Sequence, residues 1–124
     1  MRLLLDTHIA LWWVQATDRL PPRHREVLGD PANTVYLSSI VLAEIAVKQS
    51  IGKLSVPDEF ESHLHAEGLD PLSFTGRHAR TLRSLPLHHR DPFDRMLLAQ
   101  AIADDLVFVT ADSRAGSYAV RLLP

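Results

Sequence analysis

The sequence contains no cysteine, which excludes disulfide bonds and thiolate metal sites. It also lacks any uninterrupted apolar run near the ~20 residues that a membrane-spanning helix needs, so we expect no membrane association. Arg2 precedes an apolar stretch as in a signal peptide, but Asp6 and His8 interrupt that stretch and no small-residue cleavage site follows. We therefore expect a cytoplasmic protein.

The chain also lacks an excess of positive charge. The chain has 13 Lys and Arg and 15 Asp and Glu, which gives a net charge of −2. It therefore lacks the overall positive charge that is typical of proteins that bind nucleic acid. Positive charge is instead local, because residues 77–95 hold five arginines and three histidines beside only two acids, Asp91 and Asp94. The 124 residues, 46% of them hydrophobic, fit one globular domain, which we expect to span 1–124.

Short apolar runs alternate with helical patterns along the chain. Strands are predicted at residues 2–6, 34–37, 69–74, 106–110 and 120–123, and helices at 7–15, 21–28, 40–50, 57–68, 75–84 and 91–104. This alternation predicts an α/β fold with a mainly parallel central sheet of about four to five strands, flanked by helices on both faces. Pro71 weakens the third strand and suggests that it lies at an edge.

Four acids fall at or near strand ends or helix starts, where open α/β sheets bind ligands. Each also has a purely structural interpretation. Asp6 suits a helix N-cap, and Glu44 suits a surface pair with Lys48 four residues later. Asp94 fits a capping box, and Asp112 fits an Asx turn. Asp6 and Asp112 follow two buried strands, so we expect them to be close in space.

Clustered carboxylates cannot all stay ionised without a cation, and oxygen ligands suit Mg²⁺ or Mn²⁺. Such a site suggests hydrolysis of a phosphodiester, with the basic residues 77–95 holding a nucleic acid backbone. Asp91 is assigned to capping, and whether it reaches the site stays open. Asp104 and Asp105 end a helix and are predicted to be solvated. The candidate RNA contacts are Lys48, His89, Arg90 and Arg95.

Four motifs occur in order over nearly the whole chain: Leu-Leu-Asp-Thr-His, Ser-Ser-Ile-Val-Leu-Ala-Glu-Ile-Ala-Val-Lys, His-Arg-Asp-Pro-Phe-Asp-Arg-Met-Leu-Leu-Ala-Gln-Ala and Leu-Val-Phe-Val-Thr-Ala-Asp. Together they resemble the PIN domain family and, more narrowly, the VapC-type toxins of bacterial toxin–antitoxin pairs. The resemblance implies a Mg²⁺-dependent endoribonuclease that forms a homodimer and is covered by an antitoxin. It implies that the catalytic and metal-binding acids are Asp6, Glu44, Asp94 and Asp112. Thr7 and Thr110 match the hydroxyl side chains that flank these acids in the family.

Other functions fit the residues less well. A dinucleotide-binding domain needs a glycine-rich turn after its first strand, and an aspartyl phosphotransferase usually has a second acid where this chain has His8. A signalling receiver domain needs a lysine after a late strand, and the only lysines are Lys48 and Lys53. A housekeeping PIN nuclease and an RNA-binding module without cleavage stay open. One of Trp12 and Trp13 is expected to pack inward and the other to lie at a dimer or antitoxin surface.

Overall fold

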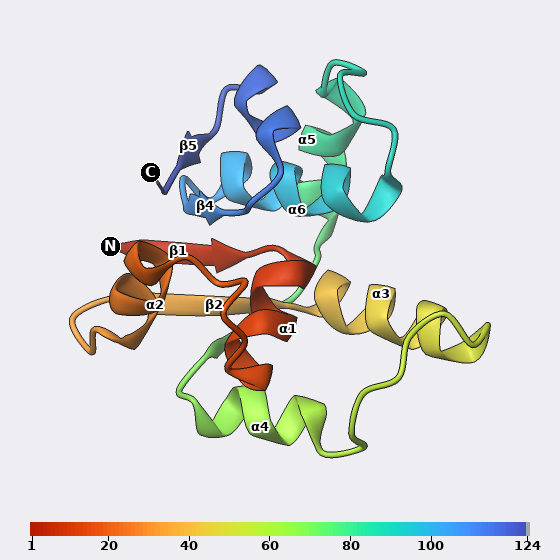
Figure 1. Cartoon of the computed structure of the whole chain (residues 1–124). Helices are drawn as coiled ribbons and strands as arrows, with labels where there is room; N and C mark the ends of the chain where they lie inside the picture. Colours follow the sequence, from red (N-terminus) through yellow and green to blue (C-terminus); the bar gives the residue numbers. More distant parts are fainter. Residues whose placement is uncertain (124) are drawn as a thin grey trace.

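Figure 1 shows the computed structural model of the chain, which describes residues 1–123. Pro124, the last residue of the predicted domain, lies outside the described residues. The elements in chain order are β1 (Arg2–Leu5), α1 (Thr7–Gln15), α2 (Pro22–Gly29), β2 (Thr34–Ser38), α3 (Ser39–Ser50), α4 (Phe60–Ala66), β3 (Asp70–Leu72), α5 (Gly76–Ser84), α6 (Pro92–Ala103), β4 (Val107–Val109), the 3₁₀ turn η1 (Ser113–Ser117) and β5 (Arg121–Leu122).

The five strands form one sheet in the order β3-β2-β1-β4-β5, and every pair of neighbours is parallel. The predicted α/β fold class is confirmed, and β3 lies at an edge as Pro71 suggested. The apolar run of β1 occupies the centre of the sheet, with Leu4 beside Tyr36 of β2 and Phe108 of β4. Leu3, Leu4 and Leu5 are completely buried, as expected for a strand covered on both faces.

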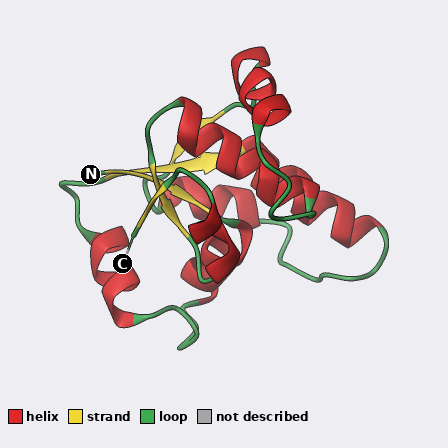
Figure 2. Cartoon of the chain, turned by 90° about the horizontal axis from the view of Figure 1, so that it is seen from above, coloured by secondary structure: helices red, strands yellow, loops and turns green. Residues whose placement is uncertain are grey.

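Helices cover both faces of the sheet. The chain moves from β1 to β2 to β3 in one direction and then crosses back to β4, so right-handed connections place α1–α4 on one face and α5 and α6 on the other. In Figure 1, α5 and α6 lie above β1 and β2, while α4 lies below them. Figure 2 shows the twisted strands at the centre with the helices around them. No helix of the described residues is long and apolar enough to cross a bilayer.

Parallel strands bring their carboxyl ends to one edge of the sheet. The chain leaves β1 into α1, β2 into α3 and β4 into η1 at this edge, and α6 begins near it. The pairing of β1 with β4 continues to Asp6, the residue directly before α1, because the N–H of Asp6 donates to the carbonyl of Val109 at 3.0 Å. This edge therefore holds the beginnings of several connections from distant parts of the sequence.

Two local predictions were wrong. The helix predicted over 57–68 is shorter, because Pro57 to Phe60 form a turn closed by a 3.0 Å backbone hydrogen bond and α4 begins only at Phe60. Asp104, predicted to be solvated, has a side chain only 11% exposed. Arg77 and His78 of α5 both contact its carboxylate, with His78 Nε2 at 2.8 Å, so it fastens α5 to the end of α6. Burial opposes its ionisation, but these partners outweigh burial and lower its pKa.

Candidate active site

Asp6 lies at the junction between β1 and α1 and is 6% exposed. Its Oδ1 accepts the N–H of Ile9 at 2.8 Å, so the capping role predicted for it is present. Its Oδ2 accepts the hydroxyl of Thr110, which follows β4. Burial raises the pKa of Asp6 to about 6, even though these hydrogen bonds and nearby His8 favour the charged form. Asp6 is thus fixed in position and costly to ionise without a cation.

Glu44 lies in the second turn of α3 and is 3% exposed. The hydroxyl of Thr7, the first residue of α1, donates to Oε1 at 2.5 Å. Lys48 Nζ lies 2.6 Å from Oε2, and this contact raises the pKa of the lysine. The predicted Glu44–Lys48 pair therefore exists, but Glu44 is buried rather than solvated. Both of its oxygens are held in a defined orientation beside the Asp6 junction.

Asp112 follows β4 and caps η1 through a 2.9 Å hydrogen bond from the N–H of Arg114. The Thr110 hydroxyl accepts the N–H of Asp112 at 3.0 Å, so one threonine links Asp112 with Asp6. Arg114 also donates from its guanidinium to both carboxylate oxygens, with Nη2 2.8 Å from Oδ2. The hydrogen bonds from Arg114 lower the pKa of Asp112 to about 2. Asp112 therefore ionises more readily than Asp6.

Asp94 lies in the first turn of α6, whose cap is Asp91. The Asp91 carboxylate accepts the N–H groups of Phe93 at 2.9 Å and Asp94 at 3.1 Å, so it caps the helix as predicted. Burial and the charge of Asp91 raise the pKa of Asp94, with smaller contributions from Glu44 and Asp112, while His89 lowers it. Asp91 thus acts on the site through its charge.

His89 is the residue of this edge whose position the sequence did not reveal. Its imidazole is 4% exposed, and Nδ1 accepts the N–H of Asp91 at 3.2 Å, which leaves the proton on Nε2. Nε2 lies 2.9 Å from Asp94 Oδ2 and 3.3 Å from Asp112 Oδ2. Among residues 1–123, the one group of three or more ligand-type side chains with atoms within 4.8 Å of one another is His89, Asp94 and Asp112.

A chain of contacts runs through the whole edge. It leads from Glu44 to Thr7 and along the backbone to Asp6, then through Thr110 to Asp112 and through His89 to Asp94. A hollow of about 260 Å³ opens beside it, with Asp6 and Asp112 in its lining. The four acids named from the sequence thus share one edge, and their role as ligands stays a prediction.

The basic residues of 77–95 do not form a single open surface. Arg77 forms an ion pair with Asp104, and Arg95 donates to the carbonyl of Pro86 at 2.9 Å. Both side chains therefore stabilise the fold through contacts within the protein. Arg90 is exposed and stays a candidate RNA contact. The ring of His89 is enclosed between carboxylates, which favours a role inside the site over a contact at an RNA-facing surface.

The PIN domain pattern matches residues 3–120 of this chain. The chain belongs to the PIN domain family. It is 30% identical to Ribonuclease VapC22 of Mycobacterium tuberculosis (strain ATCC 25618 / H37Rv), over 94% of this chain and 91% of that protein. The resemblance to VapC-type PIN domains is thereby confirmed.

Solved structures show the same fold. VapBC2 from Rickettsia felis, bound to a DNA fragment from its promoter, matches with a TM-score of 0.72 and 21% identity over 100% of this chain and 98% of that one. DNA-bound VapBC from Salmonella typhimurium matches with a TM-score of 0.64 and 21% identity over 99% and 97% of the two chains. FitAcB from Neisseria gonorrhoeae gives 0.61 and 19% over 98% and 96%. At these identities the likeness concerns the fold.

Proposed function

We propose that this PIN-domain protein is a metal-dependent endoribonuclease that acts as the toxin of a toxin–antitoxin pair. The observation that carries the proposal is the chain of contacts that joins four carboxylates from four connections at one sheet edge. The relation to a VapC ribonuclease supports RNA as the substrate, and the likeness to VapBC complexes supports a cognate antitoxin. The homodimer rests on the resemblance to VapC toxins, whereas the cytoplasmic location and the single domain over 1–124 stay predictions from the sequence.

The donor set fits a hard divalent cation. Burial raises the pKa values of Asp6 and Asp94, and neighbouring carboxylates add to the effect, so a cation at this edge would favour their charged forms. The proposed ligands all offer carboxylate oxygens, which suit Mg²⁺ and also Mn²⁺. We propose that they are Asp6, Glu44, Asp94 and Asp112. When bound, the ion would supply Lewis acidity to the scissile phosphate and to the attacking water.

The residues around the acids keep the carboxylates in position. Thr110 and the N–H of Ile9 each hold one oxygen of Asp6, which prevents rotation of the carboxylate. Thr7 and Lys48 do the same for Glu44. This arrangement fixes the orientation of Asp6 and Glu44 in advance, which favours electrostatic stabilisation of the charge that develops on phosphate.

Single-turnover cleavage of a labelled RNA tests the nuclease proposal. We expect wild-type protein with Mg²⁺ to cut the RNA, and Asp6→Asn or added EDTA to abolish cutting. Asp105→Asn is the matched control, because Asp105 has an 85% exposed side chain and lies beyond the carboxyl end of α6, whereas Asp94 lies in its first turn, and it should cut normally. Cleavage that survives both Asp6→Asn and EDTA would contradict the metal mechanism.

The toxin role has a separate test in cells. Expression of the wild-type chain alone should arrest growth, and co-expression of the short gene immediately upstream should restore it. Asp6→Asn should be harmless without that gene. A wild-type chain that cuts RNA in vitro but never slows growth would favour the housekeeping nuclease instead.

A further inference from the structure

A second hollow adjoins the acidic edge and carries the opposite charge. Its volume is about 400 Å³, and Arg19, Lys48 and Lys53 line it without any acidic residue. We call it the cationic groove. Lys48 is paired with Glu44, whereas the side chains of Arg19 and Lys53 have no ion-pair partner among residues 1–123. Two unpaired cations thus face a solvent-accessible hollow within a protein whose net charge is −2.

The hollow lined by Asp6 and Asp112, here called the acidic hollow, lies next to the cationic groove. His8 and Trp12 line both. The two rings lie with centroids 6.0 Å apart at an angle of 43°. His8 is exposed and Trp12 is partly exposed, so an aromatic surface borders both the hollow beside Asp6 and Asp112 and the cationic groove. Base stacking on an aromatic ring beside a cationic track is the usual way in which proteins bind single-stranded nucleic acid.

We propose that the cationic groove binds the RNA nucleotide adjacent to the bond that is cut. The scissile phosphate lies over the acids, the next phosphate contacts Arg19 and Lys53, and the adjoining base stacks against Trp12. Thr7 links the groove to one of the acids, since it lines the groove and donates to Glu44. This inference rests on the proposed ribonuclease function and adds the residues that hold its substrate.

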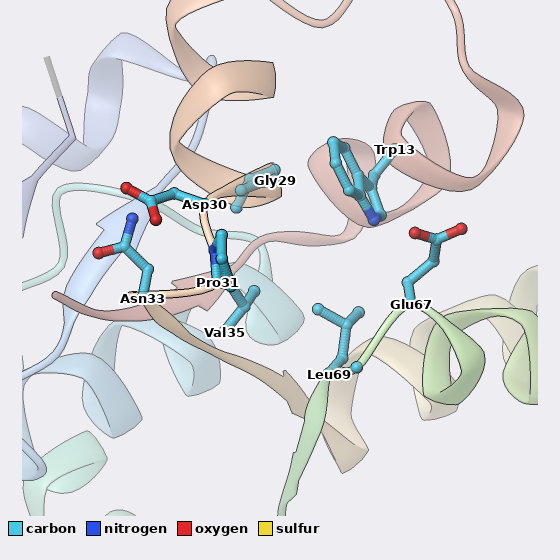
Figure 3. A pocket seen from close by; sticks show the side chains of 10 residues that line it. Trp13, Gly29, Asp30, Pro31, Asn33, Val35, Glu67 and Leu69 are labelled. Atoms are coloured by element: carbon cyan, nitrogen blue, oxygen red, sulfur yellow. The ribbon is translucent and has the colours of Figure 1, made fainter.

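The third hollow near a tryptophan has the wrong charge for this task. Trp13 lines a hollow of about 360 Å³ together with Asn33 and Leu69, which precede β2 and β3 at the amino-terminal edge of the sheet. Figure 3 shows that Asp30 and Glu67 also face this hollow. Both carboxylates would repel a phosphate. Trp12 borders the cationic groove, whereas the hollow beside Trp13 has no cationic side chain in its lining, so Trp13 provides a control for Trp12.

Salt-dependent binding tests the two cations. A labelled single-stranded RNA of mixed sequence is titrated against Asp6→Asn protein, which should not cut it, at several salt concentrations. Because each phosphate contact contributes about 0.7 to the slope of log K against log salt, adding Arg19→Ala/Lys53→Ala should reduce the slope by about 1.4 and weaken binding about tenfold or more. The matched control is Arg23→Ala/Arg121→Ala, which removes the same charge outside the groove and should leave the slope unchanged.

Fluorescence tests the stacking without a disruptive substitution. The chain has two tryptophans, so Trp13→Phe leaves Trp12 as the sole tryptophan and Trp12→Phe leaves Trp13. RNA should quench the fluorescence of Trp12 and leave that of Trp13 unchanged. Equal quenching of both, or none at Trp12, would contradict the stacking.

Three other outcomes would overturn the groove proposal. An equal slope change in the groove and control variants would mean that only overall charge matters. A change confined to Arg80→Ala/Arg83→Ala would place the RNA on α5. Normal RNA binding by the groove variant, together with loss of its complex with the co-expressed antitoxin, would assign the groove to that protein. Wild-type protein that never cuts RNA would instead refute the proposed function itself.

Discussion

At the scale of single residues, Asp6 combines a capping role with a proposed ligand role, and these two roles have opposite energetic consequences. Capping stabilises α1, whereas the buried charge destabilises the folded protein. Burial raises the pKa of Asp6 to about 6 in the folded state, so the unfolded chain, where this pKa keeps its ordinary lower value, releases the proton more readily. The ionisation of Asp6 therefore reduces stability progressively as the pH rises from about 4 to above 6.

Asp6→Asn should therefore stabilise the protein without metal at neutral pH, by about 1–3 kcal/mol. Asn keeps the N-cap acceptor and removes the buried charge. The gain should shrink as the pH falls toward about 4, where Asp6 is protonated in both states. Urea unfolding of both proteins across this pH range, in EDTA, measures it. A gain that does not depend on pH would contradict the assigned burial effect.

His89→Ala should slow RNA cleavage about 10–100-fold, the size of effect seen when groups that orient ligands are removed. The imidazole lowers the pKa of Asp94, so its loss should also move the acidic limb of the pH–rate profile to higher pH. His89→Gln, which can still donate to a carboxylate, should recover part of the rate. If the rate falls while the pH profile stays in place, the effect of His89 is only structural.

Arg114 competes with any cation for Asp112, because its N–H groups occupy both carboxylate oxygens. Its side chain is 63% exposed and free to turn outward. Arg114→Ala should therefore lower the Mg²⁺ concentration that gives half-maximal cleavage. A metal titration of the cleavage rate measures this, with Arg23→Ala as the control. A higher metal requirement in Arg114→Ala would show that Arg114 supports the metal site instead.

At the scale of elements, the 85–90 loop owes its position to a tyrosine from the far end of the chain. The Tyr118 hydroxyl accepts the N–H groups of His88 at 3.1 Å and His89 at 2.9 Å. Arg95 Nη1 also donates to the carbonyl of Pro86 at 2.9 Å. These contacts fix the loop that carries the imidazole between Asp94 and Asp112.

Tyr118→Phe should destabilise the protein by about 1–3 kcal/mol, because it leaves two backbone donors without their acceptor. Cleavage should slow as well, since His89 loses its anchor. Hydrogen exchange at the His88 and His89 amides should speed up, while amides in β1 stay protected. Unchanged exchange at those two amides would contradict the role given to Tyr118.

The sequence predicted the elements better than the contacts between them. The apolar runs placed Asp6 and Asp112 after two buried strands, because these positions depend on local pattern and the carboxyl ends of parallel strands meet at one edge of the sheet. That the two strands are neighbours came only from the structure. His89, Arg114 and Tyr118 act through partners 2 to 30 residues away whose geometry no periodicity encodes. Asp104 was predicted to be solvated because its partners on α5 come from a separate helix.

At the scale of the whole molecule, stability depends on the central strand. Leu4 is fully buried, and β1 pairs with both β2 and β4. Leu4→Ala should cost about 2–5 kcal/mol through lost burial and a cavity. Chemical denaturation measures the loss, and Leu122→Ala, on the edge strand β5 with 36% exposure, should cost far less. Equal losses at the two positions would contradict the central role of β1.

The pairing of β1 with β4 also has a consequence during protein synthesis. The first strand emerges early from the ribosome, but its partner at Val107–Val109 and the threonine that holds Asp6 emerge only after most of the chain has been made. Translation proceeds at about 5–20 residues per second, so several seconds separate the two. The nascent chain therefore carries its first acid without the surroundings that orient it, and a polypeptide whose translation stops before β4 would be released without nuclease activity.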